Sequence, residues 1–235
     1  MRPHRPSVRS LARAALLAAA VAVLPAAAAG RGADADLDLE VHHTAVVVGA
    51  DGVTRTSELR ERVHRRAELV WIERVMPPGA HGVAAHAAHD DAHAHEDLAT
   101  AARWITPAGG GVRLRLVVPD RRLILEVPEA DRAAVGFEGD WETSSRFVTA
   151  RALAAMTPSS RGAPPGARWL ERRTADGTTR ILWDVRGAYP RRVEHRNAAG
   201  TVVKTSVAAR IRAPSPAPWA RVAGYAAKEY TDVLD

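Results

Sequence analysis

The sequence predicts an α+β protein, mainly β, in which an antiparallel sheet carries one long and one or two short helices. Apolar residues recur at every second position over most of the chain, which is the periodicity of half-buried strands. Asp51-Gly52, Asp176-Gly177 and the stretch 197–200 are turn signals between such strands, and short turns favour antiparallel pairing because parallel pairing needs long crossovers. An alanine-rich stretch at 83–104 indicates a helix.

The first 29 residues predict a cleavable secretory signal. Arginines without any acid precede the apolar run Ala14–Leu24, and Ala26–Gly30 offers small residues for cleavage after Ala28 or Ala29. The run is short for a bilayer span of about 20 residues, which disfavours the alternative of a retained anchor. We therefore expect a periplasmic protein that is not an integral membrane protein once the signal is cleaved.

The strands and helices are expected in this order. Strands are predicted at 37–47, 53–65, 69–75, 112–118, 123–127, 169–173, 178–185, 191–196 and 201–211, and helices at 83–104, 149–156 and 219–234. Residues 30–212 then form the sheet domain, with a histidine-rich helical insertion at 79–104. Residues 213–235 form a proline-rich linker, Ala213–Pro218, and a C-terminal helix whose Tyr225 and Tyr230 are expected to dock on the sheet.

The composition of the chain excludes some classes of function. The chain has 33 Lys and Arg residues against 27 Asp and Glu residues, a net charge of +6. Four of the arginines lie in the predicted signal, which leaves 29 against 27, or +2, so nucleic acid is not expected as a partner. The absence of cysteine excludes thiolate ligands, a thiol nucleophile and lipid attachment through cysteine.

Two segments carry a resemblance to a known superfamily. Val46–Val75 is similar to a pair of opening hairpins, and Ile181–Ile211 is similar to a later hairpin, with Asp184, Pro190, Glu194 and Gly200 at the matching positions. In these segments the chain resembles the periplasmic half-barrel superfamily of LolA and RseB, also called MucB. The resemblance implies a curved antiparallel sheet, a half-barrel, closed on one side by helices. It also implies an apolar concave face that holds acyl chains or a lipidated partner, and an envelope protein as a possible partner.

A histidine cluster is the most unusual chemical feature of the chain. His81, His86, His89, His93 and His95 are interleaved with acids that include Asp90 and Asp97. On a helix, His86, His89 and His93 share one face, with Asp90 and Asp97 on its edges, and imidazole is a common ligand of Zn, Cu and Ni. These seven residues are therefore the predicted metal site, and the alternative is a histidine-rich loop without function.

The remaining histidines and acids suggest no further site. His42 and His43 are expected on opposite faces of the first strand, with His43 on the apolar side as a core residue. His64 and His195 are expected in solvated or cross-strand positions. Glu138 and Asp140 could be imagined as a glycosidase pair, but adjacent loop acids are usually solvated.

These observations lead to a main hypothesis and two alternatives. The main hypothesis is a non-enzymatic periplasmic protein that binds Zn, Cu or Ni for buffering, delivery or sensing. Neither a nucleophile-elbow motif nor a nucleotide-binding loop occurs, which is why no enzyme activity is expected. The first alternative is a lipid- or lipoprotein-binding half-barrel of LolA or RseB type, with a connection to envelope stress. The second alternative is a hydrolase with a non-standard site.

Overall fold

A computed structural model describes residues 36–76, 98 and 100–233 of the chain. The described residues all belong to the second of two units into which the chain divides, residues 33–235. The predicted signal peptide and the histidine cluster at 81–95 lie outside the described residues.

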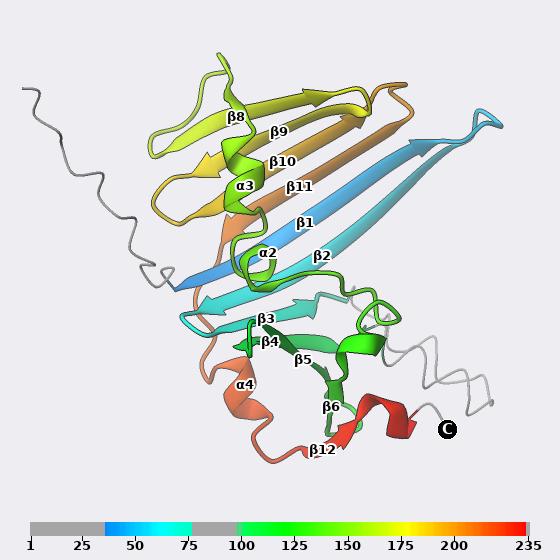
Figure 1. The fold of residues 1–235 in the computed structure, drawn as a ribbon, viewed down its shortest axis with the longest axis vertical. Coiled ribbons are helices and arrows are strands. Elements are labelled where there is room, and N and C mark those ends of the chain that lie inside the picture. The colour runs from blue at the N-terminus through cyan, green and yellow to red at the C-terminus, as the bar shows by residue number, and fades with distance from the viewer. Residues whose placement is uncertain (1–35, 77–97, 99, 234–235) are drawn as a thin grey trace, which may run out of the picture. The chain divides into compact units, whose positions relative to one another are not determined.

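One sheet of twelve strands organises the second unit (Figure 1). The strands are β1 (Leu37–Val48), β2 (Thr54–Arg66), β3 (Leu69–Arg74), β4 (Ala102–Ala108), β5 (Gly111–Val118), β6 (Leu123–Val127), β7 (Thr157–Pro158), β8 (Ala167–Thr174), β9 (Gly177–Asp184), β10 (Tyr189–Asn197), β11 (Val202–Arg210) and β12 (Ala226–Glu229). Their order is β12-β6-β5-β4-β3-β2-β1-β11-β10-β9-β8-β7, an open sheet that does not close into a barrel.

The pairing of β1 with β11 joins the two series of hairpins. β1 lies between β2 and β11, and all strand pairs are antiparallel except β12 with β6. Short turns connect most neighbours, as at Gly52 and Gly200, where positive φ angles of 74° and 73° suit glycine. The predicted fold class, α+β with a curved antiparallel sheet, is confirmed.

Residues that face each other across strands define the two faces of the sheet. Leu39 faces Val63, and Ile105 faces Val70 and Leu114, so these side chains share one face, here called the inner face. Their burial is nearly complete, and they form the main core. Three short helices, η2 (Glu129–Asp131), α2 (Trp141–Arg146) and α3 (Ala150–Ala154), lie between β6 and β7 in the chain, and α2 and α3 lie over this face (Figure 1).

The outer face is covered over part of its area by the C-terminal segment. Trp71, Ala102 and Val117 alternate with inner-face residues and pack against Val222, which follows α4 (Pro218–Arg221). This second cluster explains why the final segment of the chain returns to the sheet after β11.

Two helix predictions are wrong in part. The predicted helix 83–104 does not extend to residue 104, because Ala102–Ala108 is strand β4. The helix 219–234 is replaced by α4, β12 and the 3-10 turn η3 (Tyr230–Val233). In both places the chain pairs with a neighbouring strand, and tertiary pairing overrides alanine's intrinsic preference for helix. Tyr230 is nevertheless buried against the sheet, as expected.

The short helices in the middle of the chain have clear local causes. α3 was expected, and Thr149 caps it by accepting the Ala152 N–H at 3.1 Å. α2 was not expected. Asp140 caps it by accepting the Thr143 N–H at 2.7 Å, and this bond lowers the pKa of the Asp140 carboxyl. Asp140 therefore has a structural role at a helix start.

Candidate functional site

An apolar pocket of about 280 Å³ opens on the inner face, where α2 ends above β1, β10 and β11. It is lined by Val41, His43, Phe147, Pro190, Val193, Ser206 and Ala208. Apart from His43 and Ser206, the lining side chains are hydrocarbon. Such a lining, with a few polar groups, is typical of sites for small apolar ligands.

The strand register brings these residues together. Val41 faces Ala208, and Ser206 faces both His43 and Val193, so residues from three strands lie side by side on one face. Phe147 ends α2 with a φ of 64° and packs on the main core from above the sheet. The pocket therefore depends on the β1–β11 pairing and on the position of α2.

A chain of polar contacts crosses the floor of the apolar pocket. The Nδ1 atom of His43 lies 2.8 Å from the Ser206 hydroxyl, and its Nε2 atom lies 3.4 Å from the Glu61 carboxylate. Both ring nitrogens thus have partners. His43 is half-buried and lines a cavity, so the expectation that it is a core residue is wrong, although it does lie on the predicted face.

Serine, histidine and glutamate in contact are the side chains of a hydrolytic triad, but the surroundings do not fit that chemistry. Catalysis by such a triad needs N–H groups aimed at a developing oxyanion. Ser206 lies in the middle of β11, and the backbone of β11 pairs with β1 on one side and β10 on the other. Its N–H groups are therefore used within the sheet. The contacts suit a polar anchor in an apolar pocket better than a nucleophile.

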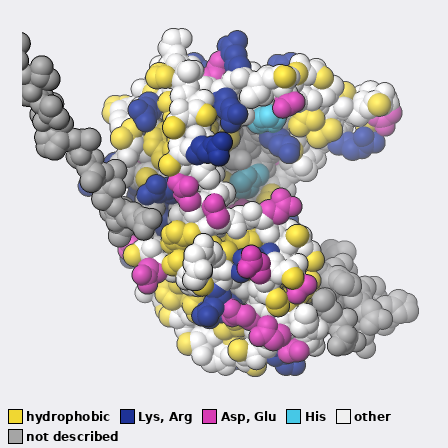
Figure 2. Space-filling view, viewed as in Figure 1, with side chains coloured by type: hydrophobic (Ala, Val, Ile, Leu, Met, Phe, Trp, Pro, Cys, Tyr) yellow, Lys and Arg dark blue, Asp and Glu magenta, His cyan; other side chains and the backbone are white. Residues whose placement is uncertain are grey.

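A second pocket of about 420 Å³, here called the polar pocket, adjoins the apolar pocket along β1 and β11. The two pockets share His43 and Ser206. The charged residues of the polar pocket are Glu58, Arg74 and Lys204. The space-filling view shows this face hollowed, with histidine side chains inside and acidic and basic side chains around them (Figure 2).

Buried polar groups hold the elements around the pockets. The Arg65 side chain is 1% exposed, and its guanidinium donates to the carbonyls of Ser145 and Gly187, each at 2.7 Å. It therefore ties β2 to α2 and to the turn before β10. Asp184, also buried, accepts the Gly187 N–H at 2.6 Å and the Arg191 Nε–H at 2.8 Å.

The environment of Asp184 acts on its ionisation in two directions. Burial alone would raise the pKa of the carboxyl, but the Gly187 N–H and the Arg191 guanidinium outweigh burial and lower it. Asp184 is therefore a carboxylate that fixes the turn leading to Pro190, a lining residue of the apolar pocket.

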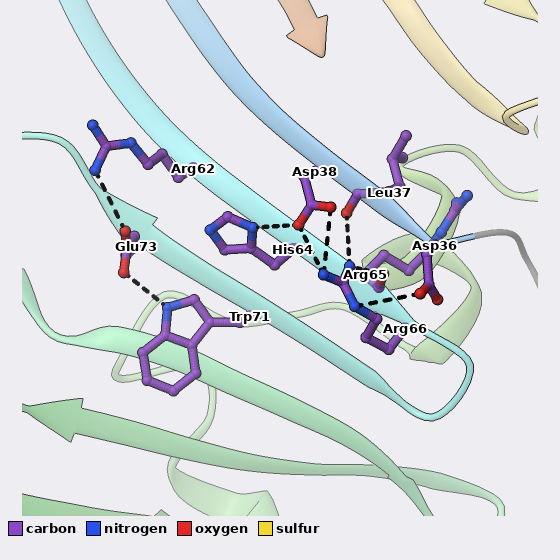
Figure 3. A network of polar contacts seen from close by, with 9 residues as sticks. All are labelled: Asp36, Leu37, Asp38, Arg62, His64, Arg65, Arg66, Trp71 and Glu73. Carbon is purple, nitrogen blue, oxygen red and sulfur yellow. Dashed lines mark hydrogen bonds and ion pairs between the residues drawn. The ribbon is translucent and has the colours of Figure 1, made fainter. Parts of the chain in front are cut away.

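A separate polar network lies on the outer face near the start of β1 (Figure 3). The Asp38 carboxylate lies 2.7 Å from the His64 Nδ1 atom and 3.1 Å from Arg66 Nη2. The Arg66 guanidinium also lies over the Trp219 ring, which anchors the C-terminal segment. His64 is 1% exposed, so the cross-strand expectation is confirmed and the solvated one is wrong. The contacts of Asp38, His64 and Arg66 fix the ends of β1 and β2.

The remaining predictions from the sequence concern the metal site, His195 and membrane-spanning helices. The seven predicted metal ligands, His81, His86, His89, Asp90, His93, His95 and Asp97, lie outside the described residues. Within the described ranges, three or more histidines and acids nowhere come together in a way that could hold a metal ion. His195 contacts Thr179 across the strands at 3.0 Å, as expected. None of the helices formed by the described residues has the length and apolar character needed to cross a membrane.

Sequence reasoning named only His43 and Pro190 among the lining residues of the apolar pocket, and neither as a ligand contact. The signal available was the alternation in 201–211, which places Ser206 and Ala208 on one face. What the sequence does not reveal is that this strand pairs with β1, more than 160 residues away in the chain.

Some solved structures are similar to this chain in fold, at low sequence identity. No family model matches the chain, and no curated protein matches it either. Among solved structures, the chain is similar to a putative outer membrane lipoprotein-sorting protein domain from Vibrio parahaemolyticus, with 11% identity, coverage of 84% of this chain and 91% of that chain, and a TM-score of 0.33. It is similar to MucB, with 13% identity, coverage of 78% and 57%, and a TM-score of 0.38. It is also similar to a LolA superfamily protein from Nitrosomonas europaea, with 10% identity, coverage of 74% and 86%, and a TM-score of 0.28. The resemblance to LolA superfamily proteins and MucB, expected from two segments of the sequence, is thus found in the comparison of structures as well.

Proposed function

We propose that this chain is an exported, non-enzymatic periplasmic protein that binds an apolar ligand, the acyl chain of a lipid or lipoprotein, in the apolar pocket of the inner face. The observation that carries the proposal is the lining of that pocket, in which hydrocarbon side chains of Val41, Phe147, Val193 and Ala208 surround one polar pair. Each methylene group transferred from water to such a lining contributes about 0.8 kcal/mol.

The test uses adjacent positions on β11 whose side chains point to opposite faces. Ala208 lines the apolar pocket, whereas Ala209 is exposed and faces away from it. Ala208→Phe fills the pocket, and Ala209→Phe is the matched control with the same change in side chain. The probe is the methyl ester of parinaric acid, a neutral acyl chain whose fluorescence rises in apolar surroundings.

We expect the protein and its Ala209→Phe variant to bind the probe with similar affinity, and Ala208→Phe to bind at least tenfold more weakly. Thermal unfolding of both variants verifies that they are folded. If the two folded variants bind the probe equally well, the apolar pocket is not the binding site. If the unchanged protein does not bind the probe, the proposed function is wrong.

A second candidate function rests on the sequence alone. The spacing of His86, His89 and His93 supports binding of Zn, Cu or Ni, for buffering, delivery or sensing. Calorimetric titration of the mature protein with each metal, against a variant with these three residues changed to alanine, tests it. Identical titration curves would remove this candidate without bearing on the apolar pocket.

A further inference from the structure

We infer that the ligand is a single-chain amphiphile with an anionic head group, held with its chain in the apolar pocket and its head in the adjoining polar pocket. This inference rests on the proposed function and adds the class of ligand. It assigns Lys204 and Arg74 as the groups that select the head.

The two pockets adjoin along the inner face, where they share His43 and Ser206. Following the paired strands β1 and β11, the inner face presents Val41 with Ala208, then His43 with Ser206, then Ala45 with Lys204. These positions are two residues apart, so the site changes from hydrocarbon to cation over about 14 Å of strand. His43 and Ser206 line both pockets and mark the boundary.

The charges of the polar pocket favour an anion. Lys204 from β11 and Arg74 from β3 approach it from either side of the β1–β2 pair, and neither forms an ion pair with another described residue. The acid in the lining, Glu58, has its carboxylate 3.4 Å from the His42 ring. The Glu61 carboxylate lies beside His43 and opposite Arg74 in the β2–β3 pairing, and Glu61 is not among the lining residues of the polar pocket, which carry two cations against one acid.

The surrounding strands add to this preference. Between residues 167 and 212, which include β8 to β11, eleven Arg and Lys residues stand against four Asp and Glu residues. A surface whose net charge has one sign raises the local concentration of ligands whose charge has the opposite sign. An anionic amphiphile is therefore attracted toward the side of the pocket formed by β10 and β11.

The size of the apolar pocket limits the ligand to one chain. A volume of about 280 Å³ lies just below the usual range for ligand sites, which is about 300–1,000 Å³. A lipid with several acyl chains would need a larger apolar space than this pocket offers.

The experiment compares three probes that share a twelve-carbon alkyl chain and differ only in the head group: tridecanoate, dodecanol and dodecylammonium. Each displaces the neutral parinaric methyl ester from the protein at low ionic strength. Lys204→Glu is the test variant, and Lys228→Glu is its matched control, because Lys228 is exposed on β12 and the change in net charge is the same.

For the unchanged protein we expect tridecanoate to bind about fivefold more tightly than dodecanol, and dodecylammonium to bind most weakly. A difference of this size is typical of interactions between partly exposed charges. Lys204→Glu should remove or reverse this order, while Lys228→Glu should keep it. Equal affinities for the three probes, or an order that Lys204→Glu leaves unchanged, would overturn the anionic preference alone. A protein that binds none of the probes would overturn the proposed function itself.

Discussion

The guanidinium of Arg65 in β2 donates a hydrogen bond of 2.7 Å to the backbone carbonyl of Ser145 in α2. Through this bond a buried cation fastens a covering helix to the sheet. The same guanidinium reaches Gly187 before β10, so one side chain links β2 to α2 and to the turn before β10, and these two elements lead to the pocket residues Phe147 and Pro190.

Replacing Arg65 with methionine should destabilise the protein by about 3 kcal/mol, since it leaves buried carbonyls without donors. Urea unfolding measures the change. Arg60→Met, at an exposed position of the same strand, is the control and should stay within about 0.5 kcal/mol of the unchanged protein. If both variants unfold at the same urea concentration, Arg65 does not hold these elements together.

Ser206 should not react as a catalytic nucleophile. Its hydroxyl contacts His43, but the backbone N–H groups of β11 around Ser206 are used in pairing with β1 and β10 and do not point at a developing oxyanion. We expect the mass of the protein to be unchanged after incubation with phenylmethylsulfonyl fluoride. A covalent adduct mapped to Ser206 would instead favour the hydrolase alternative.

Asp184 should contribute to stability in a defined range of pH. Its pKa in the folded protein is lowered, so the unfolded chain takes up a proton at higher pH than the folded one. Its stabilising contribution is complete above the ordinary aspartate pKa of about 3.9 and is lost as the pH falls through the lower value in the folded state. The difference in free energy of unfolding between the protein and Asp184→Asn should therefore shrink below about pH 4. A difference that stays constant down to pH values well below this would contradict the assignment.

If the histidine cluster binds a metal ion, the affinity should fall steeply as the pH drops below about 6.5, because only neutral imidazole is a ligand. Calorimetry with Zn at a series of pH values measures this. An affinity independent of pH between about 5.5 and 7.5 would indicate that imidazole nitrogens are not the ligands.

The sheet was predictable because its signals are local. Alternation in 112–118 and turns such as Asp51-Gly52 fix strands and hairpins from neighbouring residues alone. The two wrong helix ends have a different cause. Ala226–Glu229 is rich enough in alanine to favour helix, and it forms a strand by pairing with β6. The helix predicted at 83–104 was extended too far because its alanine-rich sequence leads directly into Ala102–Ala108, which pairs with β3 and β5.

The apolar pocket was not predictable residue by residue, because it depends on contacts between distant segments. His43 and Ser206 are adjacent only once β1 pairs with β11, and Phe147 reaches the site from a helix that was not expected. The resemblance to a half-barrel superfamily did predict an apolar inner face. It gave no means of identifying the lining residues.

The most direct test of the central claim is to photolabel the protein with a dodecanoic acid that carries a diazirine at its chain end, and to map the label by mass spectrometry. We predict labelling at apolar residues of the pocket, above all Val41, Val193 and Ala208. Labelling confined to the outer face, or spread evenly over the surface, would contradict binding of an acyl chain in the apolar pocket.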